Sequence, residues 1–255
     1  MILRIALCFL ALAIGLADDA SAQPARTYAV LSLAGNQLAI HAVRPDVGTR
    51  VSGATVNVLP IAEQVLDQAI LLSADAALKD AAPATRPVLM MSQDVALYKA
   101  GDSLFDQSPV NAENRSYLQG LARERNATHL ILITRTRDNT PVKLARNTTV
   151  TNGMLEGLGY FIDDTTRLFD VQTAESYFGM VAPFAYLKVR LVDVQTMQVL
   201  RAEPAVYSFP LARASSYPNA MAMWSDRTTD QKMKDMRDAV DGALAPALKA
   251  LINTK

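Results

Sequence analysis

The sequence predicts an α/β (α+β) sandwich, in which a mixed or antiparallel sheet is packed by helices and a protruding insertion separates core strands. Residues 183–200 alternate polar and apolar side chains, break at 193–197 and lead into a second apolar run at 199–209, which is the pattern of a hairpin. Residues 61–78 and 233–251 repeat apolar side chains about every 3.6 positions, which predicts covering helices. The apolar run THLILIT at 128–134 predicts a strand buried on both faces.

The amino terminus has the features of a secretory signal peptide, which we expect to span residues 1–22. Arg4 precedes a short apolar stretch, and Ala20-Ser21-Ala22 forms a small-residue cleavage site that leaves Gln23 first. Cys8, the only cysteine, lies inside this segment, so the mature chain would have no thiol and no disulfide. We therefore predict a periplasmic or secreted protein, and association with the outer membrane stays open.

Residues 23–255 are expected to form a single α/β domain with an insertion at about 136–181. A first hairpin is expected from two apolar runs that flank a turn at residues 34–36. The other expected elements follow in chain order. They are strand 28–33, strand 37–43, strand 56–59, a helix from 61 to Pro83, strand 88–91, a loop or helical turn 97–106, helix 111–126, strand 142–150, a glycine-rich flexible loop at 152–159, strand 169–181, loop 211–224 and a last helix from 226 or 230 that Pro246 should kink.

The charge balance argues against nucleic acid and acidic lipid as main partners. The chain has 25 basic and 25 acidic side chains, and the basic ones are scattered. Nucleic acids and anionic membranes both favour strongly basic surfaces. We expect no nucleic-acid partner, and peripheral or no membrane contact.

No residue pattern predicts catalysis, and we expect no catalytic residue, no cofactor and no metal. His41 and His129 are the only histidines, and their spacing matches no metal or catalytic motif. The glycines around 153–159 fit no phosphate-binding or dinucleotide fingerprint. Asp163-Asp164 is interpreted as a turn or helix cap, with weak calcium binding as the alternative. We therefore predict a non-enzymatic protein.

Five apolar side chains are candidate contacts for a partner protein. Adaptable methionines and a tryptophan can form a contact surface, although the same loop could be a lid over the core. Two aromatic side chains of the insertion join them. The candidates are Tyr160, Phe161, Met221, Met223 and Trp224.

Three stretches resemble the curli secretion-channel (CsgG) family and its relatives, the penicillin-binding-protein activator lipoproteins and the TolB amino-terminal domain. They are ATHLILIT at 127–134, KVRLVDVQTMQVL at 188–200 and GLGYF at 157–161. The resemblance covers about residues 55–252. It departs from the family where Met197 replaces the turn glycine and where the lipidated cysteine is missing. It implies a periplasmic protein that assists envelope assembly or secretion by binding envelope proteins or by self-association.

Two alternative functions stay open. The hairpin within 136–181 could belong to an oligomeric outer-membrane pore, although Arg146 and Glu175 would each place a charge in an apolar face. Such a charge costs about 2–4 kcal/mol at mid-depth in the membrane. A secreted enzyme of unknown class would need His41 or His129 to meet a carboxylate in a pocket.

Overall fold

The computed structural model describes residues 26–44, 55–61, 63–106, 108–143, 149–150, 154–169, 176–211 and 217–253. The expected signal peptide at 1–22 lies outside them. The strands are β1 (Tyr28–Leu33), β2 (Gln37–Val43), β3 (Thr55–Pro60), β4 (Val88–Met90), β5 (His129–Arg135), β6 (Arg137–Asp138), β7 (Val142–Lys143), β8 (Thr149–Val150), β9 (Leu155–Phe169), β10 (Ser176–Asp193) and β11 (Val199–Ser208). The helices are α2 (Val65–Ala81), α3 (Val95–Ala100), the 3-10 helix η1 (Gly101–Phe105), α4 (Pro109–Glu124), α5 (Ala220–Asp226) and α6 (Thr229–Asn253).

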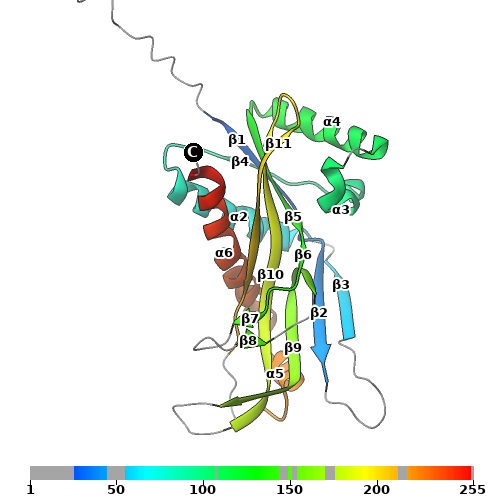
Figure 1. The fold of residues 1–255 in the computed structure, drawn as a ribbon, viewed down its shortest axis with the longest axis vertical. Coiled ribbons are helices and arrows are strands. Elements are labelled where there is room, and N and C mark those ends of the chain that lie inside the picture. The colour runs from blue at the N-terminus through cyan, green and yellow to red at the C-terminus, as the bar shows by residue number, and fades with distance from the viewer. Residues whose placement is uncertain are drawn as a thin grey trace, which may run out of the picture.

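The 18-residue strand β10 runs through both halves of one mixed sheet (Figure 1). We call the half with β1, β4 and β5 the upper storey and the half with β2, β3 and β9 the lower storey. Its residues 187–193 pair with β5, and its residues 176–186 pair with β9. Both partners lie on the same side of β10, because β11 pairs along the other side. β5 and β9 therefore lie end to end. The next row repeats this arrangement, with β1 parallel to β5 and β2 parallel to β9.

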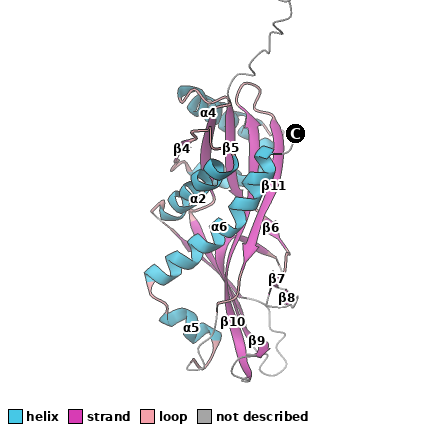
Figure 2. Cartoon of the chain, turned by 90° about the vertical axis from the view of Figure 1, so that its left-hand side faces the viewer, coloured by secondary structure: helices cyan, strands magenta, loops and turns pink. Residues whose placement is uncertain are grey.

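Helices and a small sheet cover both faces of this sheet. Alternate β1 residues enter different cores, since Val30 packs beneath α2 and α6 whereas Leu31 packs with α3 and α4. Figure 2 shows α2 and α6 crossing the same face of the sheet. The pair β7–β8 adds Val142 and Val150 to a third core over the lower storey. The predicted fold class is confirmed. In the described part of the chain, no helix combines the length and hydropathy needed to span a membrane.

The predicted first hairpin is wrong, because β1 and β2 do not pair with each other. They follow one another along the sheet, β1 beside β5 and β2 beside β9. The Gly35-Asn36 step that suggests a reversal instead passes the chain from one storey to the next. A side chain at Gly35 would meet the backbone nitrogen of Asp67 at 2.3 Å, so α2 packs directly against this step. A long-range contact thus overrides the local turn signal.

Within the expected insertion, the long strands continue the main sheet instead of leaving it. β9 and the lower half of β10 pair with each other, and β9 also pairs with β2. The predicted strand 142–150 is, in its described residues, two short strands that pair with each other. The predicted flexible loop is wrong at Gly157 and Gly159, which lie in β9. Residues 144–148, 151–153 and 170–175 lie outside the described ranges.

The expected helices over 61–83, 111–126 and the carboxyl terminus are confirmed as α2, α4 and α6. Thr228 and Gln231 exchange side-chain to backbone hydrogen bonds that cap the start of α6. The expected loop 211–224 is wrong from residue 220 onward, because α5 begins there. Its first backbone N–H, on Ala220, donates to Asp164 Oδ1 of β9 at 2.7 Å. That capping contact comes from a distant strand and has no local signature.

The predicted hairpin of β10 and β11 is confirmed, with its turn at residues 193–197. Asp193 Oδ1 accepts bonds from the backbone nitrogen and hydroxyl of Thr196, at 2.7 and 2.8 Å. Met197 has a left-handed backbone with φ of 55°. That conformation favours glycine, which is the residue expected at this turn from the resemblance.

Gly159 marks a close approach of β2 to β9 and provides a test of the core geometry. A Cβ atom there would lie 2.0 Å from the Ala39 carbonyl oxygen and 2.7 Å from the ring of Phe184. We expect Gly159→Ala to lower the free energy of unfolding by about 1–3 kcal/mol or more. Gly120→Ala in α4 is the matched control, because nothing lies within 4 Å of its added Cβ. It should stabilise by about 0.5–1 kcal/mol. Urea denaturation measures both, and equal stabilities would contradict the close approach.

Candidate interaction surface

A buried carboxylate joins α2, α3 and the step between β1 and β2. Asp67 is 1% exposed, and its Oδ1 accepts bonds from Ser32 Oγ at 2.5 Å, Ala34 N at 3.2 Å and Gly35 N at 2.9 Å. Its Oδ2 accepts a bond from the Tyr98 hydroxyl at 2.5 Å. Burial, and then the contact with Asp67, raise the pKa of Tyr98 well above 10.0, so this hydroxyl stays a donor. These donors satisfy the carboxylate and give it a structural role.

A cavity of about 280 Å³ opens beside this carboxylate. It lies where the chain leaves β3, where it leaves β4 and where it steps from β1 to β2. Its lining residues are Gly35, Asn36, Ile61, Glu63, Gln64, Asp67, Gln93, Val95 and Tyr98. The lining includes two carboxylic acids and no lysine or arginine. A cavity of this character disfavours anions and accommodates hydrogen-bond donors or short apolar groups.

Exposed apolar side chains lie on β3 and beside β4 and α3, on the side of the sheet where the cavity opens, and we call this side the edge surface. Of them, Val95 lines the cavity. On the β3 side it comprises Val56, Val58 and Leu59, which are 51%, 46% and 37% exposed. On the side of β4 and α3 it comprises Met91 and Val95, which are 53% and 62% exposed. β3 is an edge strand whose six residues are all exposed. The edge surface thus combines a free strand edge, an apolar border and a cavity.

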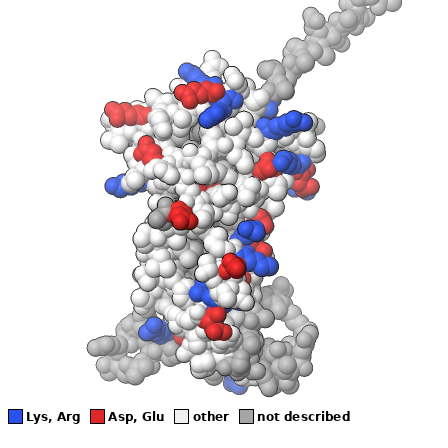
Figure 3. Space-filling view, turned by 180° about the vertical axis from the view of Figure 1, so that it is seen from behind, with Lys and Arg blue, Asp and Glu red and all other residues white. Residues whose placement is uncertain are grey.

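On the face seen from behind, the charged side chains do not form a competing site of one sign. Figure 3 shows acidic and basic side chains interspersed over one face, without a large patch of either. β3 itself carries no charged residue. Interspersed charges of this kind do not favour a polyanion as partner.

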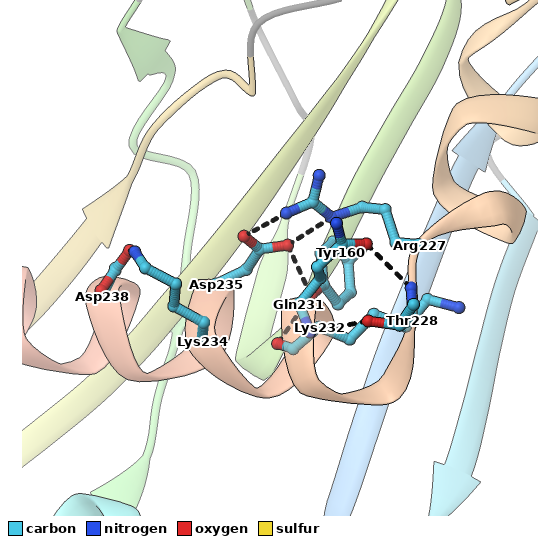
Figure 4. Close-up of polar contacts among 8 residues, drawn as sticks. All are labelled: Tyr160, Arg227, Thr228, Gln231, Lys232, Lys234, Asp235 and Asp238. Atoms are coloured by element: carbon cyan, nitrogen blue, oxygen red, sulfur yellow. Dashed lines mark hydrogen bonds and ion pairs between the residues drawn. The ribbon is translucent and has the colours of Figure 1, made fainter.

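Figure 4 shows a second polar cluster, which clamps α6 onto β9. Arg227 donates to both carboxylate oxygens of Asp235, at 2.7 and 2.6 Å. The Tyr160 hydroxyl lies 2.9 Å from the Lys232 carbonyl oxygen and 3.2 Å from Asp235 Oδ2. Burial, and then the negative charge of Asp235, raise the pKa of Tyr160 above 10.0. The bidentate geometry and the burial of Asp235 indicate a structural clamp.

The predicted partner contacts are split between the two faces of the sheet. Tyr160 and Trp224 are brought together, with ring centroids 5.9 Å apart, and Met221 and Met223 pack into the same core. Phe161 lies on the opposite face of β9, in the core over the lower storey. Tyr160, Phe161 and Met223 are buried, so in this structure they cannot meet a partner directly. Met221 and Trp224 are half-buried, and their contact role stays a prediction.

The neighbouring carboxylates Asp163 and Asp164 point to different partners. Asp163 is 3% exposed and accepts bonds from the backbone and hydroxyl groups of Thr165 and Thr166. Asp164 accepts the Ala220 N–H at the start of α5. Asp163 therefore binds residues of its own strand, beside an irregularity in the pairing of β9 with β10, whereas Asp164 holds the start of a helix, as the cap interpretation expects. Within the described ranges, no three His, Cys, Asp or Glu side chains gather to hold a metal ion.

Neither histidine lines the cavity. His41 packs edge-on against Phe184, with centroids 5.7 Å apart. Burial, and then the charge of Arg137, lower the pKa of His41 below 6.5, against a smaller opposite effect of Glu156. His129 lies on β5 near Tyr28, and burial is the main cause that lowers its pKa as well. Both histidines are therefore mainly neutral near pH 7.

A third polar cluster, which sequence patterns did not indicate, ties η1 to the sheet. Arg190 of β10 is 7% exposed and binds the carboxylate of Asp102 and the hydroxyl of Thr134. Lys188 binds the other oxygen of Asp102 at 2.7 Å. The alternation of β10 shows that Lys188 and Arg190 share a face, but their acidic partner is 86 and 88 residues away. Asp67 gave no signal either, because an aspartate in the first turn of a helix is common.

Comparisons with known proteins identify no family. No protein-family model matches the sequence, and no curated protein matches it at a significant level. Among solved structures, the chain is similar to a PelC dodecamer from Paraburkholderia phytofirmans, at 11% identity over 90% of this chain and 89% of that chain, with a TM-score of 0.32. It is similar to a putative neuraminyllactose-binding hemagglutinin homologue from Helicobacter pylori, at 8% identity over 89% and 86%, with a TM-score of 0.36. It is also similar to the lipoprotein GNA1162 from Neisseria meningitidis, at 11% identity over 78% and 94%, with a TM-score of 0.27. Likeness at this level defines neither family membership nor function.

The Asp67 cluster predicts a loss of stability on removal of one hydroxyl. Tyr98→Phe keeps the buried ring but leaves Asp67 Oδ2 without its donor. We expect a fall of about 1.5–3 kcal/mol in the free energy of unfolding, because a hydrogen bond to a charged group is lost. Tyr117→Phe is the control, since Tyr117 is 49% exposed and should change stability by less than about 0.5 kcal/mol. Thermal and urea denaturation measure the difference. Equal effects of the two changes would show that the hydroxyl does not support the fold.

The lowered pKa of His41 predicts a stability that falls in mild acid. The unfolded chain takes up a proton near pH 6.5, whereas the folded chain resists that proton to lower pH. The free energy of unfolding is therefore complete above pH 6.5 and decreases as the pH falls toward the lowered pKa. We expect His41→Gln, which stays uncharged, to flatten this decrease in unfolding experiments between roughly pH 8 and 5.5. His129→Gln is the comparison and should remove only the part of the pH dependence that is due to His129. If His41→Gln left the pH dependence unchanged, the lowered pKa of His41 would not be the cause of the fall in stability.

Proposed function

We propose that this chain is a non-enzymatic periplasmic protein that assists envelope assembly or secretion by binding other proteins, through the edge surface. The observation that carries the proposal is the edge surface itself. Among the described residues, β3 pairs on one side only, and five large apolar side chains are exposed along this side of the sheet, one of which, Val95, lines the cavity. Such a combination is typical of a protein-binding surface. The expected signal peptide and the resemblance to the curli secretion-channel group support the location and the pathway.

The polar clusters support a binding role over catalysis. The carboxylates of Asp67 and Asp235 each have several partners within the chain, and Asp102 is bound to Lys188 and Arg190. Catalytic groups are usually placed in a cavity with strained or incomplete bonding. The one carboxylate here that is both buried and beside the cavity is fully occupied by donors. The edge surface therefore offers shape and apolar contact more than reactive groups.

The pore alternative meets a structural obstacle. β9 and the lower half of β10 lie inside the sheet, and side chains such as Tyr160 and Phe161 are buried on its opposite faces. A membrane hairpin made from these strands would have to leave both cores, with the loss of that apolar packing. We therefore favour the binding role.

Charge placed on the edge surface should abolish partner binding. We expect the double variant Met91→Asp and Val95→Asp to lose proteins that crosslink to the wild-type chain in the periplasm, because carboxylates at an apolar interface are costly to bury. Val110→Asp is the control, since Val110 on α4 is also a highly exposed valine, at 70%. Mass spectrometry of crosslinked samples identifies the partners and the mature amino terminus, expected at Gln23.

The same crosslinking experiment separates the possible failures of this proposal. Partners that survive the double variant but are lost with Val110→Asp would move the binding surface to α4. A chain that is retained in the cytoplasm with Met1 intact would overturn the location. An absence of any specific crosslinked protein would overturn the binding role.

A further inference from the structure

The free edge of β3 has an unusual lack of protection. Edge strands in natural proteins are commonly blunted by charged side chains, by proline within the strand or by extreme shortness. β11, at the opposite edge, carries Arg201, Glu203 and Pro204, and β4 is only three residues long. β3 has none of these devices over its residues 55–59. Figure 1 shows β3 as the outermost strand of the lower storey, with no described element beyond it.

The pairing of β3 with β2 determines which backbone groups face outward. Ile61 N donates to Asn36 O at 2.9 Å, in the register that pairs Gln37 with Pro60. Residues in antiparallel strands alternate between hydrogen-bonded and non-hydrogen-bonded pairs. Residues 55, 57, 59 and 61 therefore point their backbone groups at β2. The N–H and C=O groups of Val56 and Val58 point away from the sheet, and Pro60, which has no N–H, falls in the outward set.

From this alternation we propose that a second copy of this chain pairs its β3 antiparallel with the first, about a two-fold axis at Asn57. In that register Val56 lies opposite Val58 of the other copy, and each such pair exchanges two backbone hydrogen bonds. All four outward groups of Val56 and Val58 are then satisfied. The pairing continues the lower storey of one chain into that of the other. The inference deepens the proposed function, because it names one partner of the edge surface.

Side chains are compatible with this self-pairing. Val56 and Val58 lie on the face that continues to His41 and Ala39, so a valine faces a valine across the axis on that side. Aliphatic cross-strand pairs are stabilising, whereas like charges opposite one another are destabilising. A symmetric pair brings identical side chains together, so the absence of charge in β3 removes the main obstacle to it.

The small size of the contact indicates a dimer that dissociates readily. One strand of six residues is short compared with stable interfaces, which bury about 1,200–2,000 Å² in total. We therefore expect a weak and reversible dimer.

Disulfide trapping tests both the pairing and its register. The mature chain expected from residue 23 lacks cysteine, so an introduced cysteine is the only thiol. Asn57 forms a non-hydrogen-bonded pair with itself across the axis, at a Cα separation of about 4.5 Å, which suits a disulfide. We expect Asn57→Cys to give a covalent dimer under mild oxidation. Thr55→Cys is the matched control. It lies opposite Leu59 of the other copy and roughly 13 Å from its own equivalent, four residues along the strand, so it should not crosslink.

Sedimentation equilibrium of the cysteine-free chain provides an independent measurement. We expect a monomer–dimer equilibrium that Val58→Pro abolishes, because proline removes an outward N–H while the ladder to β2 is kept. Circular dichroism confirms that the variant is folded. A monomer at all concentrations, a dimer unaffected by Val58→Pro, or equal crosslinking of Thr55→Cys and Asn57→Cys would each overturn the inference.

These results are distinguishable from failure of the proposed function. A dimer trapped at Asn57 in a chain that crosslinks no other envelope protein would support self-pairing and overturn the wider binding role. Partners lost on charging Met91 and Val95, in a chain that stays monomeric, would support the binding role and overturn self-pairing.

Discussion

The carboxylate of Asp67 is the interaction on which the rest of this structure depends. It receives backbone N–H groups from Ala34 and Gly35 at the point where the chain passes from the upper to the lower storey. A buried charge without partners would be strongly destabilising, so the helix that carries Asp67 must dock where those donors are. Tyr98 completes the set from α3 and so brings that helix to the same place. The cavity opens beside this junction, with Asp67 and Tyr98 in its lining.

The length of β10 has a second consequence, which concerns where the protein can meet others. β10 spans both storeys and has paired strands on both sides. Its two faces are covered by helices and by the β7–β8 pair. Close approaches such as that of Ala39 to Gly159 leave no room for added groups within the sheet. Because the faces are covered, the backbone N–H and C=O groups of the edge strands are the ones that remain available to bind a partner. Of these edges, β11 carries charged residues and a proline and β4 is three residues long, whereas β3 is six residues long and has no charge and no internal proline.

The polar clusters act as clamps between elements that are distant in the chain. Asp235 with Arg227 and Tyr160 holds α6 to β9, and Asp102 with Lys188 and Arg190 holds η1 to β10. In each case an acidic side chain from a helical segment meets donors that include a residue of a central strand. Because Asp235 and Arg190 are buried, removing the partner of either leaves it unsatisfied and costs more than the pair contributes. The clamps thus position η1 and α6 against the sheet.

The sequence by itself determined the elements whose signal is local. The alternation in 183–209 and the 3.6-residue periodicity of α2 and α6 predicted the hairpin and the covering helices, and the apolar run of β5 predicted a central strand. Only the tertiary structure decided how these elements connect. The local sequence at Gly35-Asn36 predicts a hairpin turn. In the structure, the Gly35 N–H donates to Asp67, and the chain continues from β1 into the collinear strand β2. Gly159 reads as part of a loop, yet it is a strand position where a neighbouring carbonyl leaves no space for a side chain. The aromatic and methionine residues predicted as contacts are mostly core, because apolar composition alone does not distinguish an interface from an interior.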